Sequence, residues 1–362
     1  MLDKSKRYLI VGLGLLGGKY ALELTRAGYT VDGINRSEGH LQFALDHGYI
    51  RSGKTHDFED LVQSADHIIF ALYPTAMIEW FKTYGSLLKP GCIFTDVSGV
   101  KTGLVEPIQA LCPDGVEFIA SHPMAGRETS SVEHAAEVNF APANFIITPT
   151  EKNTPEAVQW ARELAEVLGF KHICTLTVQE HDKMIGYVSQ LCHAIAVSLM
   201  CANDNTSLCE YTGDSFRDLT RIARINDKMW AELFLWNKEN LIAEIDQFDA
   251  ALSQLRNALV ASDRDKLEEM FRLSTQRRAA FDKKAAFPPS AAPRSTKRLR
   301  KSLRHRFAVP AVPLSALACH LPRPGGDVAK RQREDGPWQA GKVCSKRMGL
   351  FCCKRVGPAV FC

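Results

Sequence analysis

The chain has 362 residues, 45% of them hydrophobic, which is enough for a substantial core and for two domains. Its net charge of +4 is unevenly divided: residues 288–362 carry 16 Lys or Arg and 3 Asp or Glu, whereas residues 1–287 carry 29 and 38. We therefore expect an acidic body that does not bind nucleic acid, followed by a basic tail. No secretory signal is predicted, and the apolar helical stretch 191–202 is too short for the roughly 20 residues of a membrane span, so we expect a cytoplasmic protein.

The stretch 8–37 has the pattern of a strand, a glycine turn, a helix and a second strand. Its turn carries G-x-G-x-x-G, the fingerprint of a dinucleotide site in this context. The first glycine allows a tight turn, the second lets a pyrophosphate approach the backbone, and the third lets the helix pack closely on the strand. The N–H groups at the helix N-terminus then face the phosphates. The residues expected to bind the cofactor here are Gly12, Gly14, Leu15, Leu16 and Gly17.

The end of the second strand normally selects the cofactor, because an acidic residue there binds the ribose 2′-hydroxyl and an arginine accommodates a 2′-phosphate. This chain has Asn35, Arg36 and Ser37 at that point, and Asp32 lies inside the strand. An amide, a cation and a hydroxyl favour NADP, and NAD remains open. All three residues are expected to contact the cofactor.

Strands and helices continue to alternate after this unit, which predicts an α/β, doubly wound and mostly parallel sheet. Ligands of such sheets bind beyond the carboxyl ends of the strands. Tyr73 and Pro74 follow one predicted strand and are expected to bind the cofactor, and the stretch from Ser98 to Lys101 follows the next. Strands are expected at 67–72, 92–97, 117–121, 144–148 and 171–175, and helices are expected to begin near Ser37, Asp57, Thr75 and Thr102.

From about Thr177 the strand signals stop, and the chain is predicted to be helical. Residues 181–203 and 227–260 are each predicted as one long helix. The second has an apolar stripe longer than the core of one small domain needs, so we expect part of it to pack against a second subunit of a homodimer.

Ser262 and Asp265 resemble a capping box that opens a last helix to about Phe281. The predicted organisation is a Rossmann-type dinucleotide-binding domain at 1–176, an all-helical substrate and dimerisation domain at 177–287, and a basic, disordered tail at 288–362.

His122 directly follows the predicted strand 117–121, beside the cofactor site. A histidine there can accept a proton from a hydroxyl while hydride leaves the same carbon. The alternative is a structural histidine that caps a loop.

Two further groups of side chains could bind a substrate. At 3.6 residues per turn, Asp182, Ser189 and His193 share one face of the helix 181–203, unless the first is only part of an N-terminal cap. Arg217 and Arg221 lie one turn apart, with Arg224 a further turn on, so they could clamp a carboxylate or pair with acidic residues on the surface.

No metal site is predicted, because the histidines and cysteines of the body lack short ligand spacings. The six cysteines of the body are expected to be buried free thiols.

Five motifs occur in order along the chain: GLGLLGG, DVSGVKTG, SHPMAGRE, HDKMIGYVSQLCHAIA, and FRDLTRIA followed by Met229-Trp230. Together, over about residues 5–281, they resemble the prephenate dehydrogenase family of tyrosine biosynthesis. The resemblance implies an NAD(P)-dependent enzyme that oxidises the ring hydroxyl of prephenate with loss of CO2, giving 4-hydroxyphenylpyruvate. It implies that His122 is the base, that Arg221 binds a substrate carboxylate, and that His193 lies on the helix lining the substrate site.

The chain departs from the family pattern at two motifs. The first histidine of S-H-L-P-H is Gln190 here, beside Ser189, so an amide stands where the family has an imidazole. The usual G-S-V-K is Ser98-Gly99-Val100-Lys101, so the serine expected to orient the base is displaced by one position. We keep Ser98 and Lys101 as candidate catalytic residues, and Ser189 and Gln190 as candidate substrate-binding residues.

Two other functions remain open. Arogenate differs from prephenate only in having an amino acid side chain, so the chain could be an arogenate dehydrogenase that forms tyrosine directly. The other alternative is a non-catalytic, nucleotide-sensing Rossmann protein whose basic tail binds nucleic acid.

Overall fold

The computed structural model describes residues 2–126, 129 and 131–281. The segment 288–362, for which the sequence predicts disorder, lies outside the described residues. We call the part from β1 to β9 the sheet region and the part from α7 to α12 the helical region.

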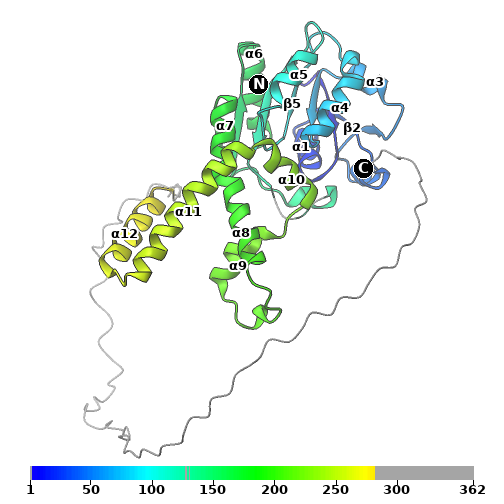
Figure 1. Ribbon diagram of the computed structural model, residues 1–362. Coiled ribbons are helices and arrows are strands. Elements are labelled where there is room, and N and C mark those ends of the chain that lie inside the picture. Colours follow the sequence, from blue (N-terminus) through cyan, green and yellow to red (C-terminus); the bar gives the residue numbers. More distant parts are fainter. Residues whose placement is uncertain (1, 127–128, 130, 282–362) are drawn as a thin grey trace, which may run out of the picture. The chain divides into compact units, whose positions relative to one another are not determined.

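A six-stranded parallel sheet in the order β3-β2-β1-β4-β5-β6 forms the centre of the sheet region (Figure 1). The strand order reverses between β1 and β4, and ligands of doubly wound sheets bind at such a switch point. The predicted Rossmann-type fold is therefore confirmed. The strands are β1 (Arg7–Val11), β2 (Thr30–Ile34), β3 (Ser52–Lys54), β4 (His67–Phe70), β5 (Ile93–Asp96) and β6 (Glu117–Phe118).

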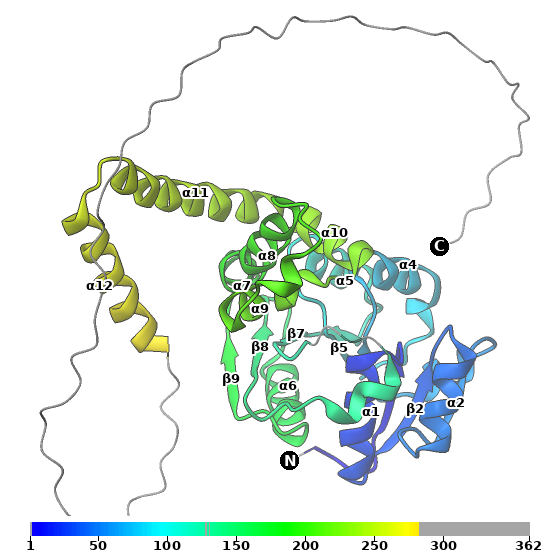
Figure 2. The same cartoon turned by 90° about the horizontal axis from the view of Figure 1, so that it is seen from below.

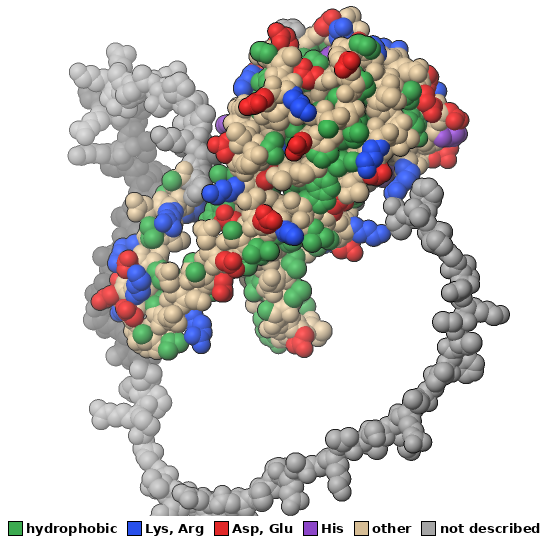
Figure 3. All heavy atoms as spheres, turned by 45° about the horizontal axis from the view of Figure 1, so that its top comes forward, with side chains coloured by type: hydrophobic (Ala, Val, Ile, Leu, Met, Phe, Trp, Pro, Cys, Tyr) green, Lys and Arg blue, Asp and Glu red, His purple; other side chains and the backbone are tan. Residues whose placement is uncertain are grey.

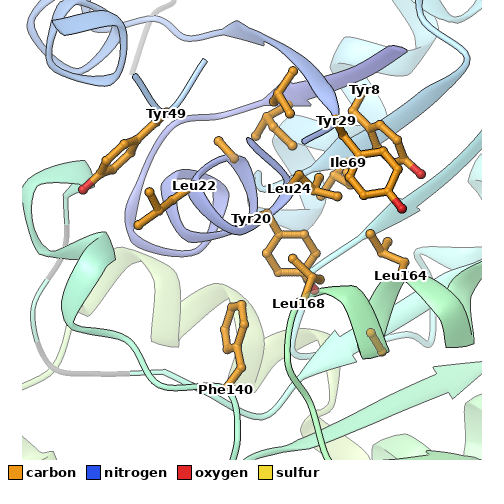
Figure 4. Packing of buried hydrophobic residues seen from close by; sticks show 14 of the residues in the cluster. Tyr8, Tyr20, Leu22, Leu24, Tyr29, Tyr49, Ile69, Phe140, Leu164 and Leu168 are labelled. Carbon is orange, nitrogen blue, oxygen red and sulfur yellow. The ribbon is translucent and has the colours of Figure 1, made fainter. Parts of the chain in front are cut away.

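Alternate side chains of the buried strands enter two separate hydrophobic cores, as the two-residue period of a strand requires. Tyr8 and Ile10 of β1 belong to one core, and Leu9 and Val11 belong to the other. Figure 4 shows the first core around α1. The helices of this first core are α1 (Leu15–Arg26), α2 (Glu38–Asp46), η2 (Val132–Glu137) and α6 (Pro155–Val167). The helices of the second core are α3 (Glu59–Ser64), α4 (Pro74–Tyr84) and α5 (Val105–Leu111). A short 3₁₀ turn, η1 (Gly85–Leu87), follows α4.

A second, three-stranded sheet follows the first, with α6 lying against it (Figure 2). It consists of β7 (Ala120–Pro123), β8 (Asn144–Thr148) and β9 (His172–Thr175), and β7 runs antiparallel to β8. The single strand expected at 117–121 was wrong, because the chain passes from one sheet to the other at Ile119. This transfer places His122 inside β7 instead of just beyond a strand of the main sheet.

The helical region begins where predicted. Thr177 and Glu180 form a capping box at the start of α7. A π-helical segment, η3, then separates α7 from α8, and the chain breaks again at Asn237, so the two long helices expected at 181–203 and 227–260 are each interrupted. The elements are α7 (Val178–Ile185), η3 (Gly186–Leu191), α8 (Cys192–Cys201), η4 (Leu208–Glu210), α9 (Asp214–Thr220), η5 (Arg221–Ala223), α10 (Asp227–Trp236), α11 (Lys238–Val260) and α12 (Arg264–Phe281).

The last helix is described as far as Phe281, and its N-terminus is capped differently from the expectation. Ser262 has a φ of 52°, and the side chain of Asp263 accepts a hydrogen bond from the N–H of Lys266. The expected Ser262 capping box is therefore replaced by an Asp263 cap, because Ser262 occupies the left-handed turn between α11 and α12.

The described chain contains one helical run long and apolar enough to cross a membrane, Val178–Cys201, with a mean hydropathy of 1.5. The expectation that no stretch has that length was therefore wrong. Length and composition alone are weak evidence for a span, because core helices of soluble proteins pass the same test. The start of the run is fixed to the sheet region: the carboxylate of Asp182 accepts hydrogen bonds from the backbone N–H groups of Lys101 and Thr102.

The six cysteines of the body are free thiols, as expected, but burial was predicted wrongly for most of them. Three of the exposed ones lie in the helical region, where apolar surfaces are open in the single chain. Cys92 is buried and Cys112 is intermediate, whereas Cys174, Cys192, Cys201 and Cys209 are exposed.

Candidate active site

The glycine turn has the geometry that a dinucleotide needs. Gly12 has a φ of 98°, and a Cβ on Gly17 would lie 1.8 Å from the carbonyl oxygen of Gly12. A Cβ on Gly14 would meet no atom within 4 Å, so the backbone is open at the position where a pyrophosphate approaches. Gly14 is also the N-cap of α1, with no side-chain cap among the described residues. The turn therefore fits a dinucleotide phosphate, with Leu15 and Leu16 opening the helix.

The residues after β2 support the turn. The Asn35 side chain accepts a hydrogen bond from the N–H of Leu13 at 2.9 Å and donates one to the carbonyl of Ser37 at 3.0 Å. Ser37 caps α2, with its hydroxyl accepting from the N–H of His40. Arg36 is exposed between them. Asp32 is buried in β2 and bound by Arg7, Arg51 and Ser52, so it does not reach a ribose.

Tyr73 and Pro74 lie after β4, where Pro74 is the first residue of α4. The hydroxyl of Tyr73 accepts a hydrogen bond from the side chain of Asn226, and the N–H of Thr75 donates to Glu232 at 2.7 Å. The edge of the predicted cofactor site is thereby joined to the helical region near α10.

A buried ion pair lies at the end of β5. The ammonium of Lys101 donates to Asp96 at 2.6 Å and to the carbonyl of Ser121 at 2.7 Å, and all three residues are buried. Asp96 also accepts from the N–H of Ser121. Burial lowers the pKa of Lys101, although the Asp96 carboxylate opposes this shift. Lys101 therefore fixes β7 against β5, one residue before His122.

Ser98 and Gly99 form the turn between Asp96 and Lys101. The Ser98 N–H donates to Asp96, and its hydroxyl accepts from the N–H of Val100 at 3.4 Å. A Cβ on Gly99 would lie 3.8 Å from Nε2 of His122. The position beside the imidazole is thus the one occupied by glycine, and the Ser98 hydroxyl caps its own turn.

The imidazole of His122 is joined to a second histidine and then to a carboxylate. Its Nδ1 lies 2.9 Å from Nε2 of His181, and Nδ1 of His181 lies 2.7 Å from Oδ1 of Asp182. His181 and Asp182 are fully buried. Burial lowers the pKa of His122 well below its usual range, and His181 and Lys101 lower it further. His122 is therefore neutral, and its imidazole can act as a base near neutral pH.

The pKa values of the two supporting groups agree with this arrangement. Burial lowers the pKa of His181, although its hydrogen bond to Asp182 opposes the shift. Burial by itself raises the pKa of Asp182, but hydrogen bonds from His181 and Thr102 outweigh it and leave that pKa below its usual value. Asp182 is therefore a carboxylate, and the imidazoles of His122 and His181 are both neutral.

Gln190 makes hydrogen bonds within the protein through both ends of its amide. Its Nε2 donates to the carbonyl of Leu233 at 2.9 Å, and its Oε1 accepts from the side chain of Asn237 at 2.7 Å. Asn237 also donates to the backbone carbonyl of Asp182. The buried amide therefore ties η3 to α10 and α11.

The expected shared face of Asp182, Ser189 and His193 was wrong, because the π-helical η3 between them changes the number of residues per turn. Asp182 faces the turn at Lys101. His193 instead stacks on Trp230, with ring centroids 3.7 Å apart, and its Nδ1 bonds to the carbonyl of Ser189. Burial lowers the pKa of His193.

The three arginines do not form one regular helical face. Arg217 lies in α9, where it bonds to the carbonyl of Thr212 and pairs with Asp214, whereas Arg221 opens the 3₁₀ turn η5 and Arg224 follows it. For Arg217, the alternative of pairing with an acidic residue on the surface is therefore observed. Arg221 is exposed on η5, which packs against α8, the helix that carries His193.

Sequence reasoning missed the roles of His181, Asp96 and Asn237. A signal existed for the first two: a His-Asp pair opens an otherwise apolar helix, and an acidic residue ends an apolar strand. No local pattern marks Asn237, because its partners lie 47 and 55 residues away.

The glycine turn at the switch point of a doubly wound sheet, together with a neutral, half-buried imidazole, defines an NAD(P)-dependent dehydrogenase. Residues 20–174 match the family model for the prephenate dehydrogenase nucleotide-binding domain, and residues 177–273 match the model for the prephenate dehydrogenase dimerization domain. This chain therefore belongs to the prephenate dehydrogenase family of tyrosine biosynthesis.

Individual relatives agree. The chain is 32% identical over 294 residues to a prephenate dehydrogenase of Lactococcus lactis subsp. cremoris, covering 78% of this chain and 80% of the relative. The structure of prephenate dehydrogenase from A. aeolicus in complex with hydroxyphenyl propionate and NAD+ is 28% identical, with a TM-score of 0.70 over 76% of this chain and 98% of that one. A Synechocystis arogenate dehydrogenase structure is 25% identical, with a TM-score of 0.65 over 76% and 99%.

Proposed function

We propose that this chain oxidises the ring hydroxyl of prephenate with an NAD(P) cofactor and releases CO2, giving 4-hydroxyphenylpyruvate. The observation that carries the proposal is the placement of His122, whose Nδ1 is held by His181 while its Nε2 lies beside Gly99, next to the residues that follow β5. A base in that position can reach a hydroxyl bound in front of the switch point.

The reaction needs a proton acceptor and a hydride acceptor. The bound nicotinamide would supply the hydride acceptor. Nε2 of His122 takes the hydroxyl proton as the C–H bond of the same carbon breaks. The bond to the ring carboxylate then breaks and CO2 leaves. The electron pair of that bond makes the ring aromatic. The oxygen of the original hydroxyl, which became a carbonyl oxygen in the oxidation, takes up a proton as the phenol forms.

Other side chains hold the base and the substrate. Lys101 and Ser98 act on the base through the backbone, since the ammonium of Lys101 binds the Ser121 carbonyl and Ser98 shapes the turn beside the imidazole. Arg221 binds a substrate carboxylate as a guanidinium fork. His193 and Ser189 line the substrate site, and Gln190 supports that helix from its buried side.

The cofactor pocket is proposed to take NADP in preference to NAD. The exposed guanidinium of Arg36 stands beyond β2, whereas the carboxylate of β2, Asp32, is bound by Arg51 and Arg7. A cation in that position accommodates a 2′-phosphate.

The functional unit is proposed to be a cytoplasmic homodimer, formed through the helical domain at 177–287 that follows the dinucleotide-binding domain at 1–176. Figure 3 shows hydrophobic side chains exposed along the helical region. Leu252 of α11 is 51% exposed and Phe271 of α12 is 56% exposed, which is more apolar surface than an isolated domain normally leaves open.

Arogenate is the second candidate substrate. The support is specific: the Synechocystis arogenate dehydrogenase structure resembles this chain about as closely as the prephenate dehydrogenase structure does. The amide of Gln190, in η3, also stands where the family motif has an imidazole.

The test is the formation of NADPH and NADH, followed by absorbance, with prephenate and with arogenate. We expect turnover of prephenate, faster with NADP+, and a loss of about 10²–10⁴ in kcat for His122→Asn. Binding of the dinucleotide by His122→Asn, measured by fluorescence, is the control for folding. Turnover of arogenate alone would transfer the proposal to that substrate, and no turnover of either by the wild-type chain would refute it.

A further inference from the structure

The hydrogen bonds behind His122 assign the position of each proton. The Asp182 carboxylate can only accept, so Nδ1 of His181, 2.7 Å away, carries a hydrogen. In a neutral ring the other nitrogen is then bare, so Nε2 of His181 is an acceptor. Nδ1 of His122, 2.9 Å from it, must donate. The remaining nitrogen of His122, Nε2, is left without a hydrogen and is free to act as the base.

In the part of the chain that the structure describes, no side chain supports the front of the ring by a hydrogen bond. Position 99 is a glycine, and a Cβ there would only make van der Waals contact with Nε2 of His122, at 3.8 Å. Among the described residues, the bond to His181 is the hydrogen bond that holds the His122 ring. The charged groups around this pair are Lys101, Asp96 and Asp182.

We infer that His181 and Asp182 are positioning residues that hold His122 in the tautomer whose Nε2 is the free base. The inference rests on the proposed function for its catalytic consequence, but the tautomer itself is a property of the ligand-free protein. Asp182 is in turn fixed by the N–H groups of Lys101 and Thr102, at 2.9 and 2.6 Å. The base is therefore held from the turn after β5 through the first turn of α7.

Asp182→Asn is the informative substitution. Its single oxygen is expected to stay on the N–H groups of Lys101 and Thr102, which turns the amide nitrogen towards His181 and reverses both imidazole tautomers. Nε2 of His122 then carries a hydrogen and cannot accept one from the substrate. We expect kcat to fall by about 10²–10⁴, as happens when a base is held in the wrong tautomer, with a much smaller change in KM.

Two variants of His181 separate positioning from folding. His181→Leu removes the acceptor for Nδ1 of His122 and is expected to lower kcat by about 10- to 100-fold. His181→Gln restores an acceptor oxygen and is expected to recover part of the loss. The matched control is His172→Gln on β9, an exposed histidine outside the site, for which wild-type kinetics are expected.

The direct readout is the tautomer of His122 in the ligand-free full chain, from ¹⁵N NMR of the imidazole, with His122→Asn used to assign the signal. We expect a hydrogen on Nδ1 in the wild type and on Nε2 in Asp182→Asn. If the wild type carries the hydrogen on Nε2, or if Asp182→Asn and His181→Leu both keep wild-type kcat and pH profile, the inference is overturned. If Asp182→Asn does not fold, the kinetics of His181→Leu and the NMR spectrum of the wild type test the inference. Because the spectrum needs no substrate, a chain that turns over neither prephenate nor arogenate would still test it.

Discussion

The sheet region and the helical region use their side chains in opposite ways. In the sheet region even charged groups are buried and paired, as Lys101 is with Asp96, and the apolar residues fill two closed cores. In the helical region large apolar side chains are open in the single chain, with Leu252 at 51% exposure. The sheet region is therefore complete by itself, whereas the helical region has the surface of a structure that needs a partner.

The proposed catalytic site lies where these two regions meet. The candidate base is on β7, the histidine bonded to it is on α7, and Asp182 of α7 accepts from the turn after β5. The open helical region thus contributes a buried contact at its first turn, and α10 adds a second contact through Glu232 and Thr75. The comparison predicts that damage to the sheet region unfolds the protein, whereas damage to the far helices changes its assembly.

The largest effect is expected at Gly17, where the sheet region has no space for another atom. In Gly17→Ala the new Cβ would lie 1.8 Å from the Gly12 carbonyl oxygen, so the free energy of unfolding should fall by about 3 kcal/mol. Gly14→Ala is the matched control, because its Cβ meets no atom within 4 Å. It should keep the stability within about 0.5 kcal/mol and lose dinucleotide affinity. Urea denaturation and a dinucleotide titration measure both, and equal stability of the two variants would contradict the packing argument.

An intermediate effect is expected on assembly. Leu252→Glu places a charge on the exposed apolar stripe of α11 and should weaken self-association by about 2 kcal/mol, or roughly 30-fold in the dissociation constant. Unfolding of the sheet region should be unaffected. Sedimentation velocity over a concentration series gives the dissociation constant. Leu111→Glu, at a 41% exposed site on α5, is the control and should not change association. A wild-type chain that is monomeric would contradict the comparison of the two regions.

The effect that is smallest at neutral pH is an acid sensitivity that belongs to the sheet region. Burial lowers the pKa of His67 to about 4, and its ring stacks on Trp160. Below about pH 6.5 the unfolded chain binds a proton that the folded chain resists, so stability is lost as pH falls from about 6.5 to about 4, by at most about 1.4 kcal/mol per pH unit. His67→Phe should remove this contribution, whereas His172→Gln should not. Urea unfolding across that range measures it, and an unchanged slope in His67→Phe would assign the sensitivity to other groups.

Local chemistry explains what sequence reasoning predicted well. The glycine turn is readable because its main constraints are local: Gly12 has a φ of 98°, and a Cβ on Gly17 would lie against the carbonyl oxygen of Gly12. The exposed stripe of α11 is readable for the same reason, since its period repeats along a single helix. These features depend on neighbours in the chain, so the order of residues was sufficient to find them.

The parts that sequence reasoning missed depend on contacts between distant segments. His122 meets His181 across 59 residues, and Asn237 joins Gln190 to Asp182 across 47 and 55. The π-helical η3 changes the face on which His193 lies, and the transfer of the chain between two sheets at Ile119 places His122 within β7. The sequence alone determined the fold class, the dinucleotide turn and the identity of the candidate base. Only the tertiary structure decided which groups hold that base and which of its nitrogens is free, because hydrogen-bond partners are selected by distance in space and not by distance along the chain.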